Sequence, residues 1–502
     1  MNGGIPCSLS AAMGAWLVFA APVPVDAAPE RFDRARLDTL AEALSKKPHE
    51  SRGMKALQAL GDLSYDQYRD IRFRTEAGIW RGENRGFTLD LLHPGFLFKT
   101  PVQINVVSDG MAHELPFSTD AFDYGPLVER PERAGDLAWS GFRVRTHLNR
   151  KDVLDEFLVF QAATYFRAIG RGQVYGLSGR GLAVKTADPE GEEFPQFTRF
   201  WIERPEVGAT RLVVHALLES RSLTGAYTFI VEPADEMLMT VNVTLYPRVP
   251  LEKFGLAPLN SMFLFDDTNR ERFDDFRSAV HDSDGLQMIS GRGEHIFRPL
   301  ANPTELQVSA FPDETPKGFG LMQRSRGFGD YHDAEARYEL RPSAWVEPAG
   351  DWGKGYVQLV EIPTVWETSD NIVAFWQPAR AWTAGKAYPY SYRVRWGRNP
   401  PGDAGLARVA ATRIGAVGDE GQLLFVLDFK PPGPLPKRLD IRVNASRGKV
   451  GAIGGQHVGP TGQYRVSFRF DPENNDVSEL RLIVSADGEP WSETWLYRYT
   501  TP

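Results

Sequence analysis

Two kinds of hydrophobic pattern divide the chain. Between residues 30 and 70 the apolar residues recur at helical spacing, which predicts two short helices. The first pattern consists of Phe32, Leu37, Leu40, Ala41 and Leu44, and the second runs from Met54 to Leu63. Beyond residue 100 the apolar residues alternate with polar ones. This two-residue period predicts strands with one buried face, and it is cleanest over residues 239–246.

The predicted strands end at Gly, Pro and Asp turns, and no strand–helix–strand rhythm links them. Such a pattern indicates packed antiparallel sheets, so we expect an all-β protein. The strands are predicted at 102–107, 141–148, 198–203, 211–218, 227–233, 239–246, 390–396, 423–429, 439–443, 463–470, 479–486 and 493–499.

A Pro- and Gly-rich segment at 397–405 predicts a domain boundary. The short alternating strands that follow it are typical of an immunoglobulin-like sandwich, here without cysteines. We therefore expect a large β-sandwich domain at 28–397 and an immunoglobulin-like domain at 398–502.

The first 27 residues contain no Lys or Arg, are apolar from Leu9 through Val23, and end with the small-residue sequence Val-Asp-Ala. This pattern predicts a secretory signal peptide at 1–27. The alternative is a membrane anchor, although the apolar run is short for a bilayer span. Cys7, the only cysteine, lies inside this segment. The mature protein would then carry no thiol and no membrane span, as expected for export to a bacterial periplasm.

The composition of the chain limits the kinds of partner that it can bind. The formal charge of −8 and the lack of a basic run argue against nucleic acid as a partner, because phosphate binding needs clustered Lys and Arg. Aromatic residues make up 12% of the chain, beside 47 Gly and 36 Pro, which suits a turn-rich β-protein. A neutral polymer or a small molecule is the better expectation.

Two acidic segments are candidates for catalytic chemistry. The first is Val-His-Asp-Ser-Asp-Gly at 280–285. On a strand, Asp282 and Asp284 would share one face, and a close pair of like charges raises the proton affinity of one member. The alternative is a turn in which the short Asp and Ser side chains bind nearby backbone. His281 has two interpretations as well, a hydrogen-bonded core residue or a catalyst.

The second acidic segment is Trp-Glu-Thr-Ser-Asp-Asn-Ile-Val-Ala-Phe-Trp at 366–376. Apolar neighbours and the charge of Glu367 would both disfavour ionisation of Asp370 and raise its pKa toward that of a general acid. The alternative is a turn residue at the entry to a strand. Two separated carboxylates among aromatic side chains are what glycoside hydrolysis requires.

Other chemistries lack their motifs. The sequence has no G-x-S-x-G, no H-E-x-x-H and no Walker-type loop, and its nine His residues are scattered. We therefore predict no metal and no cofactor. The charged, Tyr-containing stretch at 323–342 is either an active-site loop or a solvated connection.

Longer motifs carry a family resemblance. The segments 280–286, 291–300, 318–324, 338–348 and 370–376 resemble the periplasmic glucan biosynthesis proteins OpgG and OpgD, over nearly the whole mature chain. Details at 273–277 and 291–295 are more similar to the OpgD branch. Chains of that branch usually carry a twin-arginine leader, and none is visible here.

The resemblance implies a galactose-mutarotase-like β-sandwich followed by an immunoglobulin-like domain. It also implies action on osmoregulated periplasmic glucans, whose backbone is β-1,2-linked glucose. The implied activity is anomer-inverting endo-hydrolysis of β-1,2-glucan. Transglycosylation and a noncatalytic glucan-binding scaffold are the alternatives, and the sequence also leaves open whether the protein is a homodimer.

Carried onto matching positions, the resemblance makes Asp370 the general acid and Asp282 the general base. It places Glu367 and Tyr338 in the same site, on the path of a proton toward Asp282. Asp284 is a supporting candidate, because only the resemblance prefers Asp282 to it. Candidates for binding sugar hydroxyl groups are Arg292, Arg298, Arg324 and Arg341, and candidates for stacking on sugar rings are Trp345, Trp352, Trp366 and Trp376, although a Trp is more often a core residue.

Overall fold

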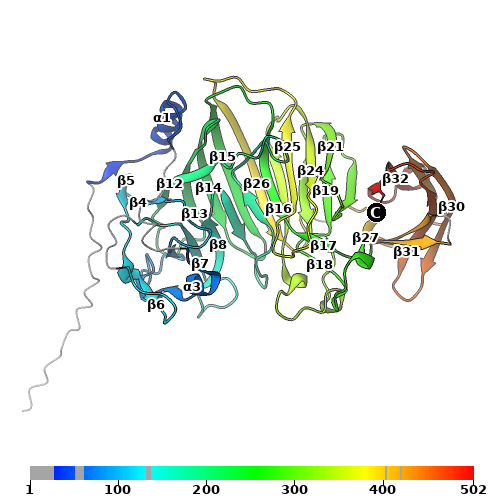
Figure 1. Ribbon diagram of the computed structural model, residues 1–502, viewed down its shortest axis with the longest axis horizontal. Coiled ribbons are helices and arrows are strands. Elements are labelled where there is room, and N and C mark those ends of the chain that lie inside the picture. Colours follow the sequence, from blue (N-terminus) through cyan, green and yellow to red (C-terminus); the bar gives the residue numbers. More distant parts are fainter. Residues whose placement is uncertain (1–27, 51–61, 132–136, 402–403, 419–420, 502) are drawn as a thin grey trace, which may run out of the picture.

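The computed structural model describes residues 28–50, 62–131, 137–401, 404–418 and 421–501 (Figure 1). The predicted signal peptide and most of the predicted second helix lie outside these residues. Strands make up 49% of the chain and helices only 7%, which confirms the all-β prediction.

The larger of two extended sheets has 16 strands and runs through most of the molecule. Its spatial order is β1 (Glu30–Arg31), β5 (Met111–Glu114), β4 (Gln103–Ser108), β12 (Gln196–Glu203), β13 (Leu212–Glu219), β14 (Leu223–Glu232), β15 (Met237–Pro247), β26 (Tyr388–Gly397), β23 (Ser343–Ala349), β22 (Gly318–Met322), β19 (Gly285–Ile289), β20 (His295–Pro299), β34 (Thr494–Thr500), β32 (Val477–Ala486) and β29 (Asp440–Ala445), with β33 (Glu489–Pro490) beside β32.

The second sheet has ten strands and packs against the first. Its order is β21 (Gln307–Glu314), β24 (Lys354–Glu361), β25 (Ile372–Pro378), β16 (Phe254–Ser261), β10 (Ser178–Arg180), β9 (Tyr165–Ala168), β8 (Asp155–Gln161), β7 (Gly141–Thr146) and β3 (Thr88–Leu92), with β11 (Leu182–Val184) beside β16. Smaller sheets are β2 (Ile71–Phe73) with β6 (Phe122–Tyr124), β17 (Phe263–Phe265) with β18 (Val280–His281), and the four strands β27 (Arg408–Val417), β28 (Gln422–Lys430), β31 (Gln463–Asp471) and β30 (Lys449–Val458).

Every strand predicted from the sequence coincides with one of these strands. The alternation predicted at 239–246 is visible in β15, where every second side chain is buried. Aromatic rings from the two large sheets meet between them. Phe160 on β8 contacts Phe200 on β12 and Phe229 on β14, with ring centres 5.5 and 5.1 Å apart. The main core therefore lies between the sheets, as in a β-sandwich.

The first predicted helix is also confirmed, as α1 (Arg34–Ser45). The Asp33 side chain caps it by accepting a hydrogen bond from the Arg36 backbone N–H. Leu37 and Ala41 are buried and pack with Trp201 against the outer face of the larger sheet. A shorter helix, α3 (Tyr65–Arg69), and the 3₁₀ turns η1 (Thr75–Ala77), η2 (Thr119–Ala121), η3 (Arg270–Arg272), η4 (Phe328–Asp330) and η5 (Tyr338–Leu340) complete the described elements. No helix of the described residues is long and apolar enough to cross a membrane.

The C-terminal strands enclose a second core around Phe425, Phe468 and Trp495. This part adjoins the main sandwich through a parallel pair of strands, β20 and β34, which extends the larger sheet. A buried ion pair crosses the same boundary. Both terminal nitrogens of the Arg324 guanidinium donate to Glu493 over 2.8 Å, and the guanidinium lies 3.7 Å from the centre of the Phe297 ring.

Removal of Glu493 tests the role of this ion pair. Glu493→Ala would leave the buried Arg324 charge without its partner, so we expect a loss of about 3–5 kcal/mol in the free energy of unfolding. Burial raises the pKa of Glu493, but Arg324 and its hydrogen bonds lower it further than burial raises it. The stabilisation is therefore present above the pKa of an unfolded Glu and is lost as the pH falls through the lowered folded value.

Urea denaturation at pH 7 measures the effect, with the double variant Arg324→Met, Glu493→Leu as the matched control. The double variant should recover part of the loss, because it buries no unpaired charge. Equal or greater destabilisation of the double variant would contradict this account.

Candidate active site

The two acidic segments lie close together, beside the start of β25, and the charge of Asp370 acts on Asp282. Asp282 directly follows β18, and its backbone N–H donates to the carbonyl of Met262 over 2.8 Å. Asp370 stands two residues before β25, which pairs with β16. The segment 282–284 is a connection between β18 and β19, so Asp282 and Asp284 do not share the face of a strand.

The side chain of Asn371 holds the two segments together. This buried residue accepts a hydrogen bond from the Phe263 N–H over 2.8 Å and donates to the Phe263 carbonyl over 3.0 Å. It also donates to the carbonyl of Ile362 over 3.1 Å. Because Phe263 follows Met262, the residue that binds Asp282, this amide brings Asp370 close to Asp282 across 88 residues of chain.

Asp282 is a buried carboxylate with one cationic partner. It is 5% exposed and forms an ion pair with Nη1 of Arg341. Burial raises the pKa of Asp282 above its usual range, the Arg341 cation opposes that shift, and the negative charge of Asp370 adds to it. Arg341 packs against Gly176, where a Cβ atom would lie 2.9 Å from the arginine side chain.

Asp370 is more open to solvent, with a side chain that is 30% exposed. Its Oδ2 atom lies 3.5 Å from Nη2 of Arg167, on β9. The sequence suggested that Asp370 has apolar neighbours and the negative charge of Glu367 close by. In the structure, however, Glu367 binds an arginine and Trp366 is 69% exposed. The environment of Asp370 therefore differs from this expectation.

A pocket of about 270 Å³ opens beside Asp370. Phe98, Gln161, Tyr165 and Arg167 are among its lining residues. A neighbouring pocket of about 210 Å³ shares Phe98, Gln161 and Tyr165 with it, so the two pockets adjoin, and together they are called the groove beside Asp370.

Tyr338 and Glu367 belong to the same cluster. The Tyr338 ring lies 4.2 Å from the Arg341 guanidinium, and burial raises the pKa of its hydroxyl well above the usual value. Among the described residues, that hydroxyl has no hydrogen-bond partner. Glu367 binds Nη1 of Arg277 over 2.7 Å, and Arg277 also pairs with Asp275 and Asp333.

The remaining carboxylate candidate, Asp284, has a different environment. Its Oδ2 atom accepts hydrogen bonds from the backbone N–H groups of Arg324 and Ser325, over 2.6 and 3.1 Å. This geometry resembles the backbone-binding alternative that the sequence left open. Asp284 faces a second cavity, at the boundary with the C-terminal strands.

Of the four arginine candidates, the structure brings only Arg341 into the cluster. Arg298 is buried in a 3.0 Å pair with Glu361, and Arg324 is bound to Glu493. Arg292 is exposed in the turn between β19 and β20. These three positions differ from the sequence-based expectation, because side chains in buried pairs or in a remote turn do not face Asp282 and Asp370.

The tryptophan candidates divide in the same way. Trp345, Trp352 and Trp376 are buried in the core and offer no face to a ligand, whereas Trp366 is exposed one residue before Glu367. Sequence reasoning missed Arg167, Arg277 and Tyr165. Arg167 and Tyr165 occupy one face of a strand as ordinary polar alternation, and Arg277 stands in a charged loop, so their types and spacing gave no signal. No cluster of metal-binding side chains occurs among the described residues.

Comparison with known proteins supports the resemblance. Residues 32–499 match the family described as "Periplasmic glucan biosynthesis protein, MdoG". The chain belongs to this family. It is 45% identical over 473 residues to "Glucans biosynthesis protein G" of Vibrio cholerae and to the protein of that name from Shewanella baltica, covering 93% of this chain and 87% of each relative. Both relatives carry the G name, and the likeness to the OpgD branch stays a prediction.

Within this member of the glucan biosynthesis family, Arg341→Met tests the electrostatics around Asp282. The substitution removes the cation that opposes the effect of burial on Asp282, so the pKa of Asp282 should rise further. Carbon NMR of the side-chain carboxyl groups during a pH titration measures that pKa. Arg277→Met is the matched control, since Arg277 binds Glu367 instead. An unchanged or lower pKa of Asp282 in Arg341→Met would be inconsistent with the pairing described above.

Proposed function

We propose that this protein hydrolyses β-1,2-glucan in the periplasm, with inversion at the anomeric carbon. The observation that carries the proposal is the juxtaposition of Asp282 and Asp370, from separate segments, in environments of opposite character. Asp282 is buried and paired with a cation, whereas Asp370 is partly exposed beside an open groove. An inverting glycosidase needs two carboxyl groups with different tasks on opposite sides of the scissile bond.

Asp370 is the general acid of this proposal. It gives its proton to the oxygen at C2 of the departing sugar as the bond from C1 to that oxygen breaks. A sugar bound in the adjoining groove displaces water from Asp370, so the proton of the acid passes to the glycosidic oxygen and is not lost to solvent. Arg167 lies close enough to hold the oxygen atoms of the substrate or of Asp370.

Asp282 is the general base. A water molecule attacks C1 from the face opposite Asp370, and its proton passes to Asp282, directly or through another hydroxyl group. Arg341 favours the ionised form of Asp282 that can accept the proton. Tyr338 retains its proton because its pKa is raised, so its hydroxyl can both donate and accept on the route to Asp282. Glu367 borders that route.

The groove along Phe98 and Tyr165 would hold glucose units on one side of the scissile bond. The exposed Trp366 offers an aromatic face on which a sugar ring can stack, next to Glu367. We propose hydrolysis because the ion pair of Asp282 with Arg341 provides a carboxylate that can take a proton from water. Transglycosylation would use the same acid with a sugar hydroxyl in place of water.

Substitution of the acid tests the chemistry. Asp370→Asn keeps the shape of the side chain but cannot donate a proton, so cleavage of linear β-1,2-glucan should fall at least about 100-fold. Mass spectrometry and a reducing-end assay measure the products. Asp351→Asn, in the exposed turn between β23 and β24, is the matched control and should retain activity.

Each other outcome favours a different function. If the wild-type protein leaves the polymer unchanged, the hydrolase proposal is wrong and a noncatalytic glucan-binding role gains support. If the wild type makes products that are one water lighter than linear chains of equal length, they are cyclic, and the enzyme is a transglycosylase.

Asn371→Ala tests whether the amide positions the acid. Asn302 is a matched control, because its buried side chain also makes three backbone hydrogen bonds, to Leu264 and Thr364. Both variants should lose about 1–3 kcal/mol of stability. Asn371→Ala should additionally lower kcat about 100-fold, since a small misplacement of a catalytic group is costly. Equal kcat values for the two variants would refute the positioning role.

A further inference from the structure

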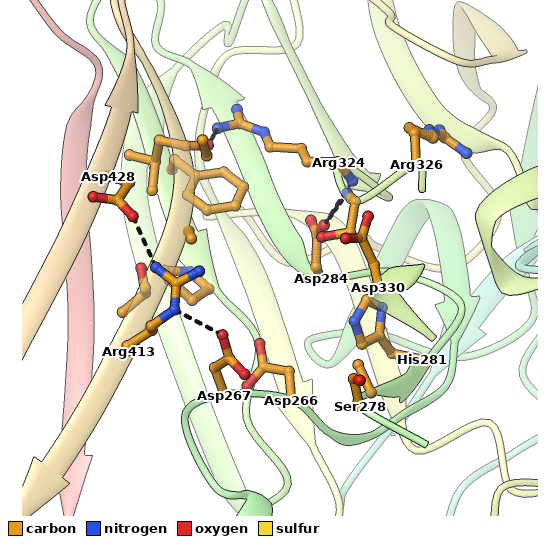
Figure 2. A pocket seen from close by; sticks show the side chains of 18 of the residues that line it. Asp266, Asp267, Ser278, His281, Asp284, Arg324, Arg326, Asp330, Arg413 and Asp428 are labelled. Atoms are coloured by element: carbon orange, nitrogen blue, oxygen red, sulfur yellow. Dashed lines mark hydrogen bonds and ion pairs between the residues drawn. The ribbon is translucent and has the colours of Figure 1, made fainter. Parts of the chain in front are cut away.

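A second cavity lies at the boundary between the main sandwich and the C-terminal strands, and the proposed hydrolysis does not use it. Its volume is about 470 Å³, within the range of roughly 300–1,000 Å³ that ligand pockets span. Figure 2 shows Asp284, Asp330 and His281 on one side of this cavity, and Arg413 and Asp428 on the other. Arg413 and Asp428 come from β27 and β28 of the C-terminal part.

His281 presents a hydrogen-bond acceptor to this cavity. Nε2 of Gln323 donates to the carbonyls of His281 and Tyr338, so the side-chain oxygen of Gln323 must accept the hydrogen bond from Nδ1 of His281. Nδ1 therefore carries the proton, and Nε2 has a free lone pair. The His281 side chain is 98% buried from bulk solvent, since its exposure is 2%, and it lines the cavity. Among the described residues, nothing donates to its Nε2.

Further polar atoms around the cavity have no partner either. Among the described residues, the buried Oδ1 of Asp284 accepts no hydrogen bond, and Nε of Arg324 and Nε of Arg326 donate none. The side-chain amide of Gln463, at the start of β31, makes no hydrogen bond within the same residues and lines the cavity from the C-terminal side. The accessible groups are Nε2 of His281, which needs a donor, and the Gln463 amide, which takes both a donor and an acceptor, so a matching ligand supplies both, as hydroxyl groups do.

The charges around the cavity disfavour an anion. Asp267 and Asp428 both bind Arg413, over 2.9 and 2.8 Å, and Arg324 is neutralised by Glu493. Asp266, Asp284 and Asp330 also line the cavity and Arg326 is the remaining cation of the lining, which leaves an excess of negative charge even though burial raises the pKa of Asp266 to about 7. A metal ion is not favoured, because the described residues contain no group of His, Asp and Glu at metal-binding spacing. A neutral, hydroxyl-rich molecule fits best.

We infer that this cavity is a second, noncatalytic binding site for a short neutral oligosaccharide, held between the main sandwich and the C-terminal strands. A hydroxyl group donates to Nε2 of His281, and others bind the amide of Gln463. Because His281 is the residue before Asp282, an occupant of this cavity touches the segment that carries the proposed base.

Titration calorimetry with a trimer of β-1,2-linked glucose tests the inference. The protein used is the Asp370→Asn variant, which cannot cleave the probe if the proposed function is right. We expect two binding sites for each protein molecule. On this background, Ala411→Trp fills the cavity from β27 and should remove one site. Ala416→Trp, on an exposed position of the same strand outside the cavity, is the matched control and should retain both.

A milder variant covers the case in which Ala411→Trp does not fold. Gln463→Ala removes only an unbonded amide, so it should weaken one of the two sites about tenfold, as expected for the loss of one hydrogen bond. The inference would be overturned if calorimetry finds only one site for the trimer and neither Ala411→Trp nor Gln463→Ala alters it. The absence of any binding would overturn it as well. Binding of inorganic phosphate that Ala411→Trp abolishes would also overturn it, since that result would identify an anion site.

The two proposals fail in different ways. Cleavage of glucan by the wild type without a second binding site contradicts only the oligosaccharide cavity. Two binding sites without cleavage contradict only the proposed hydrolysis.

Discussion

A buried side-chain amide joins the two segments that carry the candidate catalytic groups. Asn371 holds the backbone of Phe263 from both sides and binds Ile362 as well, which joins the entry of β25 to the start of β17. Asp370 is the neighbour of Asn371, and Asp282 is bound to the residue before Phe263. The hydrogen bonds of Asn371 therefore act together with the strand pairs β16–β25 and β17–β18 to fix how the two aspartates lie relative to each other. Buried amides of this kind are costly to lose, because their backbone partners would remain unsatisfied.

The three acids of the cluster differ in burial, although each lies beside an arginine. Only Asp282 is removed from water and needs that partner to be buried as a carboxylate. Asp282 pairs with Arg341, Asp370 lies beside Arg167, and Glu367 binds Arg277. The acids differ in exposure, so the same chemical group acquires different properties at each place. Such a difference is what divides acid and base roles between two carboxylates.

Much of the fold could be predicted from the sequence, because strands with one buried face leave a two-residue period. The segment 239–246 is an example, since its alternation survives in β15 as alternating burial. Sequence patterns do not predict the role of a residue when the same residue type occurs both in the core and at the surface. Trp345 and Trp376 fill the core and Trp366 is exposed, yet all three stand among similar neighbours. Arg324 pairs with Glu493 and Arg341 pairs with Asp282, and both partners are distant in the sequence. The spacing of residues along the chain therefore does not show which of the two arginines belongs to the candidate site.

The central claim is that Asp370 and Asp282 act from opposite faces of a β-1,2-glucosidic bond. Proton NMR during the first minutes of cleavage, before the released sugar ends equilibrate, tests this most directly. The account predicts that the new reducing ends appear first as the α-anomer. Initial release of the β-anomer would indicate a covalent intermediate and would contradict the roles assigned to both aspartates.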